Sequence, residues 1–183
     1  MIQNSTKLRY IRSKNRKEQT VSRSDENEGL VAQIIDAMKK NGETLSTAES
    51  ITGGAISSAL VGVPGASEIF KGGITAYSDE VKIAQLKVDP KLIEKHSAIS
   101  EQVADAMAQG AIETFKTTWA IATTGVAGPG PVGSHVAGTV WLSIRGPVNQ
   151  TTALALSGER ETVRNAATSS AIAAFARILN SRV

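Results

Sequence analysis

The stretch Ser46-Thr47-Ala48-Glu49-Ser50-Ile51-Thr52-Gly53-Gly54 contains the change of pattern that decides the fold. We interpret it as a short strand from Thr44 to Thr47, a polar turn over Ser50–Gly54, and a helix that runs to about Leu60. The glycines let the backbone come close to a ligand, and free amides at a helix start attract an anion. The turn therefore predicts a site for an oxyanion or a phosphate beside Ser50.

A second segment repeats this strand-to-helix pattern. We predict a strand from Gly73 to Ala76 and a helix capped by Ser78, which places Tyr77 and Lys82 next to the strand end. A serine becomes a nucleophile when a nearby base takes its proton, and a partly buried lysine can be that base. Tyr77 would relay the proton or orient the lysine. The alternative is that Ser50 caps a helix, Tyr77 packs at a strand end, and Lys82 is a solvated charge on a helix.

The remaining elements follow from periodicity and from turn residues. We predict helices over 28–40, 100–115 and 159–179, and strands over 119–124, 139–144 and 151–156. The strand over 119–124 is almost uninterruptedly apolar, which is typical of a strand buried within a sheet. Helices and strands alternate first and neighbouring strands follow, so the chain is predicted to form a mixed α/β sheet covered by helices.

Two further features point to ligand binding. The loop Gly125–Gly133 follows a buried strand, the usual place for a ligand in an open α/β sheet, although its spacing matches neither a dinucleotide fingerprint nor a P-loop. Arg160 and Arg164 are four residues apart and share one face of the last helix. They are candidates for clamping a phosphate or a carboxylate, the alternative being surface arginines bonded to neighbouring glutamates or to water.

Composition excludes several classes of protein. The 183 residues suffice for one domain, and the lack of cysteine excludes a thiol nucleophile and disulfides. We assign the only histidines, His96 and His135, to ordinary loop roles, and we predict no metal and no cofactor. No apolar run reaches the roughly 20 residues that span a bilayer, and we expect no secretory signal because the N-terminus lacks a continuous apolar segment. We therefore expect a soluble, cytoplasmic protein that does not bind a membrane.

The excess of positive charge lies at the N-terminus. Residues 1–23 hold seven Lys or Arg and one Glu, which gives this segment a net charge of +6. Because the whole chain has a net charge of +3, residues 24–183 have a net charge of −3. We divide the chain into a basic flexible arm, 1–27, and a globular domain, 28–183. The arm is interpreted as a disordered extension, with nucleic-acid binding, membrane binding or a presequence as alternatives. The domain is mildly acidic with few aromatic residues, so nucleic acid is not an expected partner.

Several motifs, in order from about residue 29 to 179, together resemble the C-terminal domain of the competence/damage-inducible CinA proteins. They are Thr47-Ala48-Glu49-Ser50-x-Thr52-Gly53-Gly54, Val63-Pro64-Gly65-Ala66-Ser67, Gly72-Gly73-x-x-Ala76-Tyr77-Ser78-x-Glu80-x-Lys82, Ser100-Glu101-x-Val103-Ala104, Thr124-Gly125-Val126-Ala127-Gly128-Pro129 and Gly138-Thr139-Val140. This family includes stand-alone nicotinamide mononucleotide (NMN) amidohydrolases. The resemblance implies a three-layer α/β/α domain with a mixed sheet that converts NMN to nicotinate mononucleotide and ammonia in pyridine nucleotide salvage.

The resemblance also implies roles for particular residues. Ser50 is similar to the family nucleophile, with Tyr77 and Lys82 as its activating partners. The residues expected to bind substrate are Glu49, Thr52, Gly53, Gly54, Thr124, Gly125, Arg160 and Arg164, with one of the two arginines on the nucleotide phosphate. No metal or redox cofactor is implied, the expected partner is NMN, and we expect a homo-oligomer, a dimer or larger, that pairs through the Ala-rich last helix.

Three departures from the family pattern qualify these expectations. Ile51 stands where the family often has cysteine, which we expect to change packing only. The loop Val132–His135 is shorter than usual, so it is where we expect substrate affinity or choice to differ. The nucleotide-pyrophosphatase-like domain of full CinA proteins is not seen, so we expect no hydrolysis of ADP-ribose. The alternative function is a catalytically silent nucleotide-binding module that regulates a partner.

Overall fold

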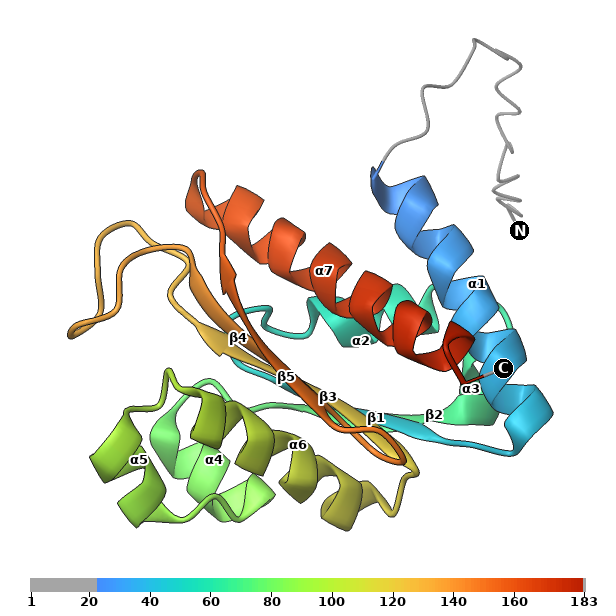
Figure 1. Ribbon diagram of the computed structural model, residues 1–183, viewed down its shortest axis with the longest axis horizontal. Coiled ribbons are helices and arrows are strands. Elements are labelled where there is room, and N and C mark those ends of the chain that lie inside the picture. Colours follow the sequence, from blue (N-terminus) through green and yellow to red (C-terminus); the bar gives the residue numbers. More distant parts are fainter. Residues whose placement is uncertain (1–22, 183) are drawn as a thin grey trace, which may run out of the picture.

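The structure is a computed structural model that describes residues 23–182 (Figure 1). Five strands and seven helices follow one another in these residues. In chain order they are α1 Arg23–Asn41, β1 Leu45–Glu49, α2 Ala55–Val61, α3 Ala66–Ile69, β2 Phe70–Thr75, α4 Asp79–Leu86, α5 Pro90–His96, α6 Glu101–Phe115, β3 Trp119–Gly125, β4 Thr139–Arg145, β5 Gln150–Ala155 and α7 Arg160–Asn180. Helices cover both faces of the sheet (Figure 1), which confirms the predicted three-layer α/β/α fold with a mixed sheet.

The order of strands in the sheet determines where its polar loops meet. The order is β2-β1-β3-β4-β5, with β1 parallel to β2 and β3, whereas β4 and β5 run antiparallel. Every residue of β1 is buried, because this strand has a neighbour on each side and helices on each face. The carboxyl ends of β1, β2 and β3 lie at one edge, so the segments that follow them are brought together.

One face of the sheet carries the larger part of the core. Helices α1, α2, α3 and α7 contribute to this layer, in which Trp119 of β3 packs edge-on against Phe175 of α7 with ring centroids 5.4 Å apart. The indole Nε1 of Trp119 donates a hydrogen bond of 3.0 Å to Glu43, so its one polar atom is satisfied. Alanines of α7, among them Ala171 and Ala176, are buried here because they allow close packing.

The opposite face is covered by α4, α5 and α6 (Figure 1). Small residues on β1 and β3, including Ala48 and Ala122, let α6 approach the sheet closely. Gly110 of α6 packs against the backbone of Leu86, where a Cβ atom would lie only 2.0 Å from the carbonyl oxygen. This close contact positions α4, which carries Lys82.

Several element bounds differ from the sequence prediction. Helix α1 begins at Arg23, five residues before the predicted start, and the part of the expected arm over 1–22 lies outside the described residues. The short helix α3 was not predicted, because four residues are too few to show a period. Helix α5 was also missed, although Asp89 caps it and Pro90 opens it, a recognisable start signal.

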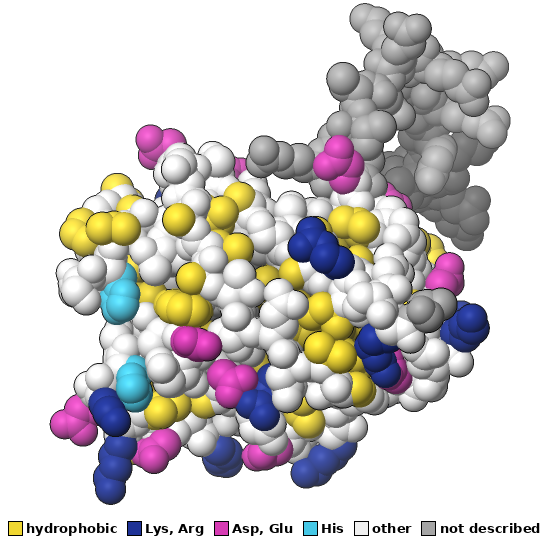
Figure 2. Space-filling model, in the orientation of Figure 1, with side chains coloured by type: hydrophobic (Ala, Val, Ile, Leu, Met, Phe, Trp, Pro, Cys, Tyr) yellow, Lys and Arg dark blue, Asp and Glu magenta, His cyan; other side chains and the backbone are white. Residues whose placement is uncertain are grey.

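The surface of the described residues is mixed in charge. On the face shown in Figure 2, acidic and basic side chains are interspersed and apolar side chains are scattered among them. None of the helices within residues 23–182 combines the length and the apolar character needed to cross a membrane.

Candidate active site

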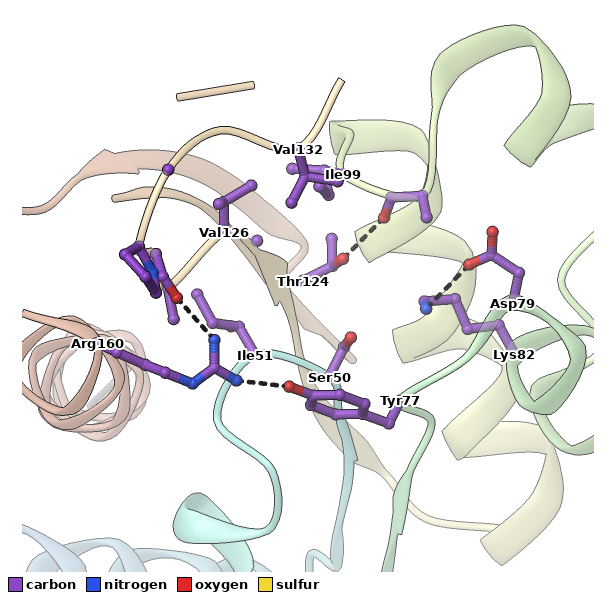
Figure 3. A pocket seen from close by; sticks show the side chains of 16 residues that line it. Ser50, Ile51, Tyr77, Asp79, Lys82, Ile99, Thr124, Val126, Val132 and Arg160 are labelled. Atoms are coloured by element: carbon purple, nitrogen blue, oxygen red, sulfur yellow. Dashed lines mark hydrogen bonds and ion pairs between the residues drawn. The ribbon is translucent and has the colours of Figure 1, made fainter. Parts of the chain in front are cut away.

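A cavity of about 320 Å³ opens at the carboxyl ends of β1 and β3. Figure 3 shows its lining side chains, which come from five parts of the chain: the turn after β1, the segment from β2 into α4, the α5–α6 connection, the long loop after β3, and the start of α7. The predicted residues among them are Ser50, Tyr77, Lys82, Thr124, Gly125 and Arg160. The fold therefore brings six of the eleven predicted site residues to one cavity.

Ser50 is the first residue after β1, and its backbone continues the sheet before the chain turns. Its N–H donates to the carbonyl oxygen of Thr123 at 2.9 Å, so the residue is held by the neighbouring strand. The side chain of Ser50 points into the cavity (Figure 3). The serine is thus anchored through its backbone, while its hydroxyl faces the space where a ligand would bind.

Lys82 reaches the same cavity from the first turns of α4. The helix starts at Asp79 behind the N-cap Ser78, whose hydroxyl accepts from the N–H of Val81. Lys82 is only 3% exposed, and its Nζ lies 3.2 Å from Oδ1 of Asp79. The ammonium therefore faces the cavity with one carboxylate partner, and Figure 3 shows it in the same region as the Ser50 hydroxyl.

The start of α4 also affects one neighbouring carboxyl group. A hydrogen bond with the Ser78 side chain holds the pKa of Glu80 below its ordinary value. Glu80 is on the surface and does not line the cavity. The effect therefore belongs to the helix cap and not to the chemistry of the site.

Tyr77 lies at the mouth of the cavity and is 58% exposed. Its hydroxyl accepts a hydrogen bond of 2.7 Å from Nη2 of Arg160, and Nη1 of the same arginine donates to the carbonyl oxygen of Gly128 at 2.9 Å. Figure 3 shows this bridge across the opening. The sequence predicted that Tyr77 relays a proton or orients Lys82, whereas here its hydroxyl orients Arg160.

Glu49 has a different role from the one predicted, because its carboxylate is fully buried and turns away from the cavity. It accepts from the N–H groups of Gly54, Ile56 and Ser57 at 2.8 to 3.1 Å, and from the Ser57 hydroxyl at 2.6 Å. From the sequence, these amides were predicted to be free to bind an anion. They already bind one, since a carboxylate from the same chain caps α2.

Arg164, Thr52 and Gly53 lie behind the cavity wall and do not line it. The guanidinium of Arg164 donates to the carbonyl oxygens of Ile51 at 3.1 Å and Thr52 at 2.8 Å. The hydroxyls of Thr52 and Thr123 are 2.8 Å apart and both residues are buried. Gly53 has a φ of +63°, a conformation that glycine adopts without strain. These residues support the turn that carries Ser50.

The wall beside Ser50 is formed by the end of β3 and the loop that follows. Thr124 is buried, and its hydroxyl donates to the carbonyl oxygen of Ala98 at 2.7 Å. Gly125 leaves no room for a side chain, since a Cβ atom would lie 2.5 Å from the carbonyl oxygen of Thr139. Ala98 and Ile99 also line the cavity; the sequence carried no signal for them, because only the tertiary fold places their turn beside β3.

Neither histidine lines the cavity. His96 is the last residue of α5, and His135 lies in the loop after β3, where its backbone pairs with Val132. Ile51 belongs to a buried apolar cluster that includes Val163 of α7, and it also lines the cavity. Within residues 23–182, no group of three His, Asp or Glu side chains lies close enough together to hold a metal ion.

These features define a class of protein: a three-layer α/β/α domain in which a serine and a buried lysine share a cavity at the strand ends, without histidine. The chain belongs to the CinA C-terminal domain family, whose model matches residues 27–179. This finding confirms the resemblance inferred from the motifs.

Individual relatives show the same relationship. A CinA-like protein of Prochlorococcus marinus is 43% identical over 124 residues, which are 67% of this chain and 29% of that protein. A CinA-like protein of Synechocystis is 41% identical over 138 residues, covering 74% of this chain and 33% of that protein. The chain therefore spans about a third or less of the length of these relatives.

Solved structures of similar length match over nearly their whole chains. The competence damage-inducible protein A of Klebsiella pneumoniae gives a TM-score of 0.82 at 32% identity, covering 84% of this chain and 97% of the other. The competence/damage inducible protein CihA of Agrobacterium tumefaciens gives 0.80 at 30% identity, with 85% and 96% covered. The fold is therefore that of a CinA C-terminal domain.

Proposed function

We propose that this domain is a nicotinamide-nucleotide amidohydrolase that converts NMN to nicotinate mononucleotide and ammonia, in cytoplasmic pyridine nucleotide salvage. The observation that carries the proposal is the shared cavity of Ser50, the buried Lys82 and Arg160. A serine beside a lysine suits acyl transfer, and an arginine at the mouth suits a phosphate group. The cavity volume is within the range typical of small-molecule sites.

The reaction would proceed in two halves. The Ser50 oxygen attacks the carboxamide carbon while Lys82, as the general base, takes the hydroxyl proton and passes it to the departing nitrogen. Breaking of the C–N bond releases ammonia and leaves an acyl-serine ester. Water then attacks this ester and gives one proton through Lys82 to the Ser50 oxygen, so the products are the free serine and a carboxylic acid, which loses its remaining proton to solvent and becomes a carboxylate.

The tetrahedral intermediates of this reaction carry a negative oxygen that needs hydrogen-bond donors. We assign the backbone N–H of Ile51 to this role, because it directly follows the nucleophile and its residue lines the cavity. No described residue accepts a hydrogen bond from this N–H. The Ser50 N–H is already bonded to Thr123, and the amides of α2 are bonded to Glu49, so these donors are not available.

Arg160 is the residue that we assign to the substrate phosphate. Its two bonds, to Tyr77 and to Gly128, leave further N–H donors of the guanidinium for an anion. The bridge holds the long side chain in place, so less conformational entropy is lost when a phosphate binds. Tyr77 would then act in substrate binding by positioning Arg160.

The experiment that tests the proposal measures ammonia release from NMN by the purified protein. We expect Ser50→Ala to abolish release and Lys82→Ala to reduce kcat by about 100-fold or more, the usual range for loss of a general base. Lys91→Ala is the matched control, because Lys91 is an exposed lysine on α5 and does not line the cavity. Circular dichroism would establish that each variant is folded.

The alternative function, a silent nucleotide-binding module, predicts a different result. Such a module would bind NMN without releasing ammonia, and Ser50→Ala would leave its function unchanged. Calorimetric binding of NMN to the wild-type protein with no turnover would therefore refute the amidohydrolase.

A further inference from the structure

Arg160 and Arg164 are one turn apart on α7, yet their guanidinium groups go to different places. Arg160 enters the cavity, whereas Arg164 lies behind the turn that carries Ser50. We propose that Arg164 is a positioning residue for the nucleophile turn and not a ligand of the substrate. The inference rests on the proposed function for its kinetic consequences, but its structural part can be tested without any substrate.

The contacts of Arg164 are directed at the backbone of the turn. Its Nε donates to the carbonyl oxygen of Ile51 at 3.1 Å and its Nη2 to that of Thr52 at 2.8 Å. The planar guanidinium holds these donors in a fixed fork, so two consecutive peptide units are oriented by one side chain. A cationic donor also makes each of these hydrogen bonds stronger than a neutral pair.

The same contacts determine the geometry next to Ser50. The N–H of Ser50 is held by Thr123, and the carbonyl of Ile51 is held by Arg164, so the peptide units on both sides of the Ser50–Ile51 peptide are restrained. This peptide carries the N–H of Ile51, the donor assigned to the oxyanion. Arg164 therefore sets the direction of that donor relative to the Ser50 hydroxyl.

Gly53 is consistent with this arrangement. A Cβ atom at Gly53 would lie 3.1 Å from Nη2 of Arg164, so the glycine leaves room for the guanidinium against the turn. The Ile51 side chain belongs to the same buried apolar cluster as Val163, the residue before Arg164. Helix α7 thus contributes to the turn both the hydrogen bonds of Arg164 and a member of the cluster that buries Ile51.

The kinetic test compares two matched variants, Arg164→Met and Arg160→Met, in ammonia release from NMN. Misplacing a catalytic group by about 1 Å can cost on the order of 100-fold in rate. We expect Arg164→Met to lower kcat by about 10- to 100-fold with KM within about two-fold, whereas Arg160→Met mainly raises KM. A rise in KM with unchanged kcat in Arg164→Met, or no change in either constant, would overturn the inference.

Arg164→Lys covers the case in which the methionine variant does not fold. Lysine keeps the charge but lacks the fork, so we expect a smaller loss of kcat and again an unchanged KM. If NMN is not a substrate, the kinetic test gives no result. Hydrogen exchange needs no substrate, so it tests the role of Arg164 separately from the proposed function. Loss of Arg164 should speed amide exchange at Ser50 and Gly54 by about ten-fold or more while α6 stays protected. Unchanged exchange at the turn would overturn the inference even if NMN is not a substrate.

Discussion

Replacing Glu49 by alanine would remove the carboxylate that caps α2 and closes the Ser50 turn. Glu49 is fully buried and accepts three backbone hydrogen bonds, from Gly54, Ile56 and Ser57, and one from the Ser57 hydroxyl, all between 2.6 and 3.1 Å. In Glu49→Ala these donors would lose their acceptor in a region that water reaches poorly. We therefore expect a large loss of stability and a disordered nucleophile turn.

The magnitude follows from the number and kind of bonds. A hydrogen bond to a charged group contributes about 1.5–3 kcal/mol, and loss of a helix N-cap alone costs about 0.5–2 kcal/mol. Bonds that share one acceptor are not additive, and the cost of desolvating the carboxylate disappears with it. The expected loss is therefore about 3–5 kcal/mol, less than the sum over the four bonds because they share one carboxylate.

Urea unfolding followed by circular dichroism would measure this change. With a slope of about 2 kcal/mol per molar urea, a loss of this size lowers the midpoint by about 2 M. Glu68→Ala is the matched control, because Glu68 forms a solvent-exposed ion pair with Lys39, and solvent screens that contact. We expect no measurable shift for the control. A midpoint for Glu49→Ala that coincides with the control would refute the reasoning.

Three further variants test other contacts of the structure. Gly110→Ala gains about 1 kcal/mol in helix propensity, but its Cβ would lie 2.0 Å from the Leu86 carbonyl oxygen, so we expect a lower Tm. An unchanged or higher Tm would contradict that close contact. Tyr77→Phe removes the acceptor of Arg160, and one such bond corresponds to about a five-fold rise in KM with little change in kcat. A fall in kcat instead would indicate that Tyr77 takes part in proton transfer, as the sequence predicted. Trp119→Phe loses the bond to Glu43, and we expect thermal unfolding to show a loss of about 1–3 kcal/mol. Full stability would show that this bond contributes nothing net.

The sequence predicted the structure best where the signal lies in neighbouring residues, as in helical or strand periodicity and in helix caps. Alternation of helical and strand periods predicted the mixed sheet, because amphipathic faces must be buried whatever the detailed packing. Ser78 was predicted as an N-cap, and its side chain accepts from the backbone N–H of Val81, three residues on. The same reasoning did not detect α3, since a single turn has no period.

Part of the site was predictable because the carboxyl ends of parallel strands lie at the same edge of a sheet. Ser50, Tyr77 and Thr124 each lie at or just after the end of a strand, so placing these strands in one sheet brings the three residues together. The presence of Lys82 in the cavity was also predictable, because it lies one turn into the helix that follows β2. The residues of the α5–α6 connection were not predictable, because no local pattern says which loop closes a cavity.

By itself the sequence determined the layers of the fold and the set of polar residues at the strand ends. Only the tertiary structure decided how those residues divide between chemistry and support. Glu49 is next to Ser50 in the chain but faces α2, because successive residues of a strand point to opposite faces. Arg160 and Arg164 share a helix face, yet one reaches the cavity and the other the turn behind it. Their separation along α7 is about 6 Å, which is enough to place them on opposite sides of a single backbone turn.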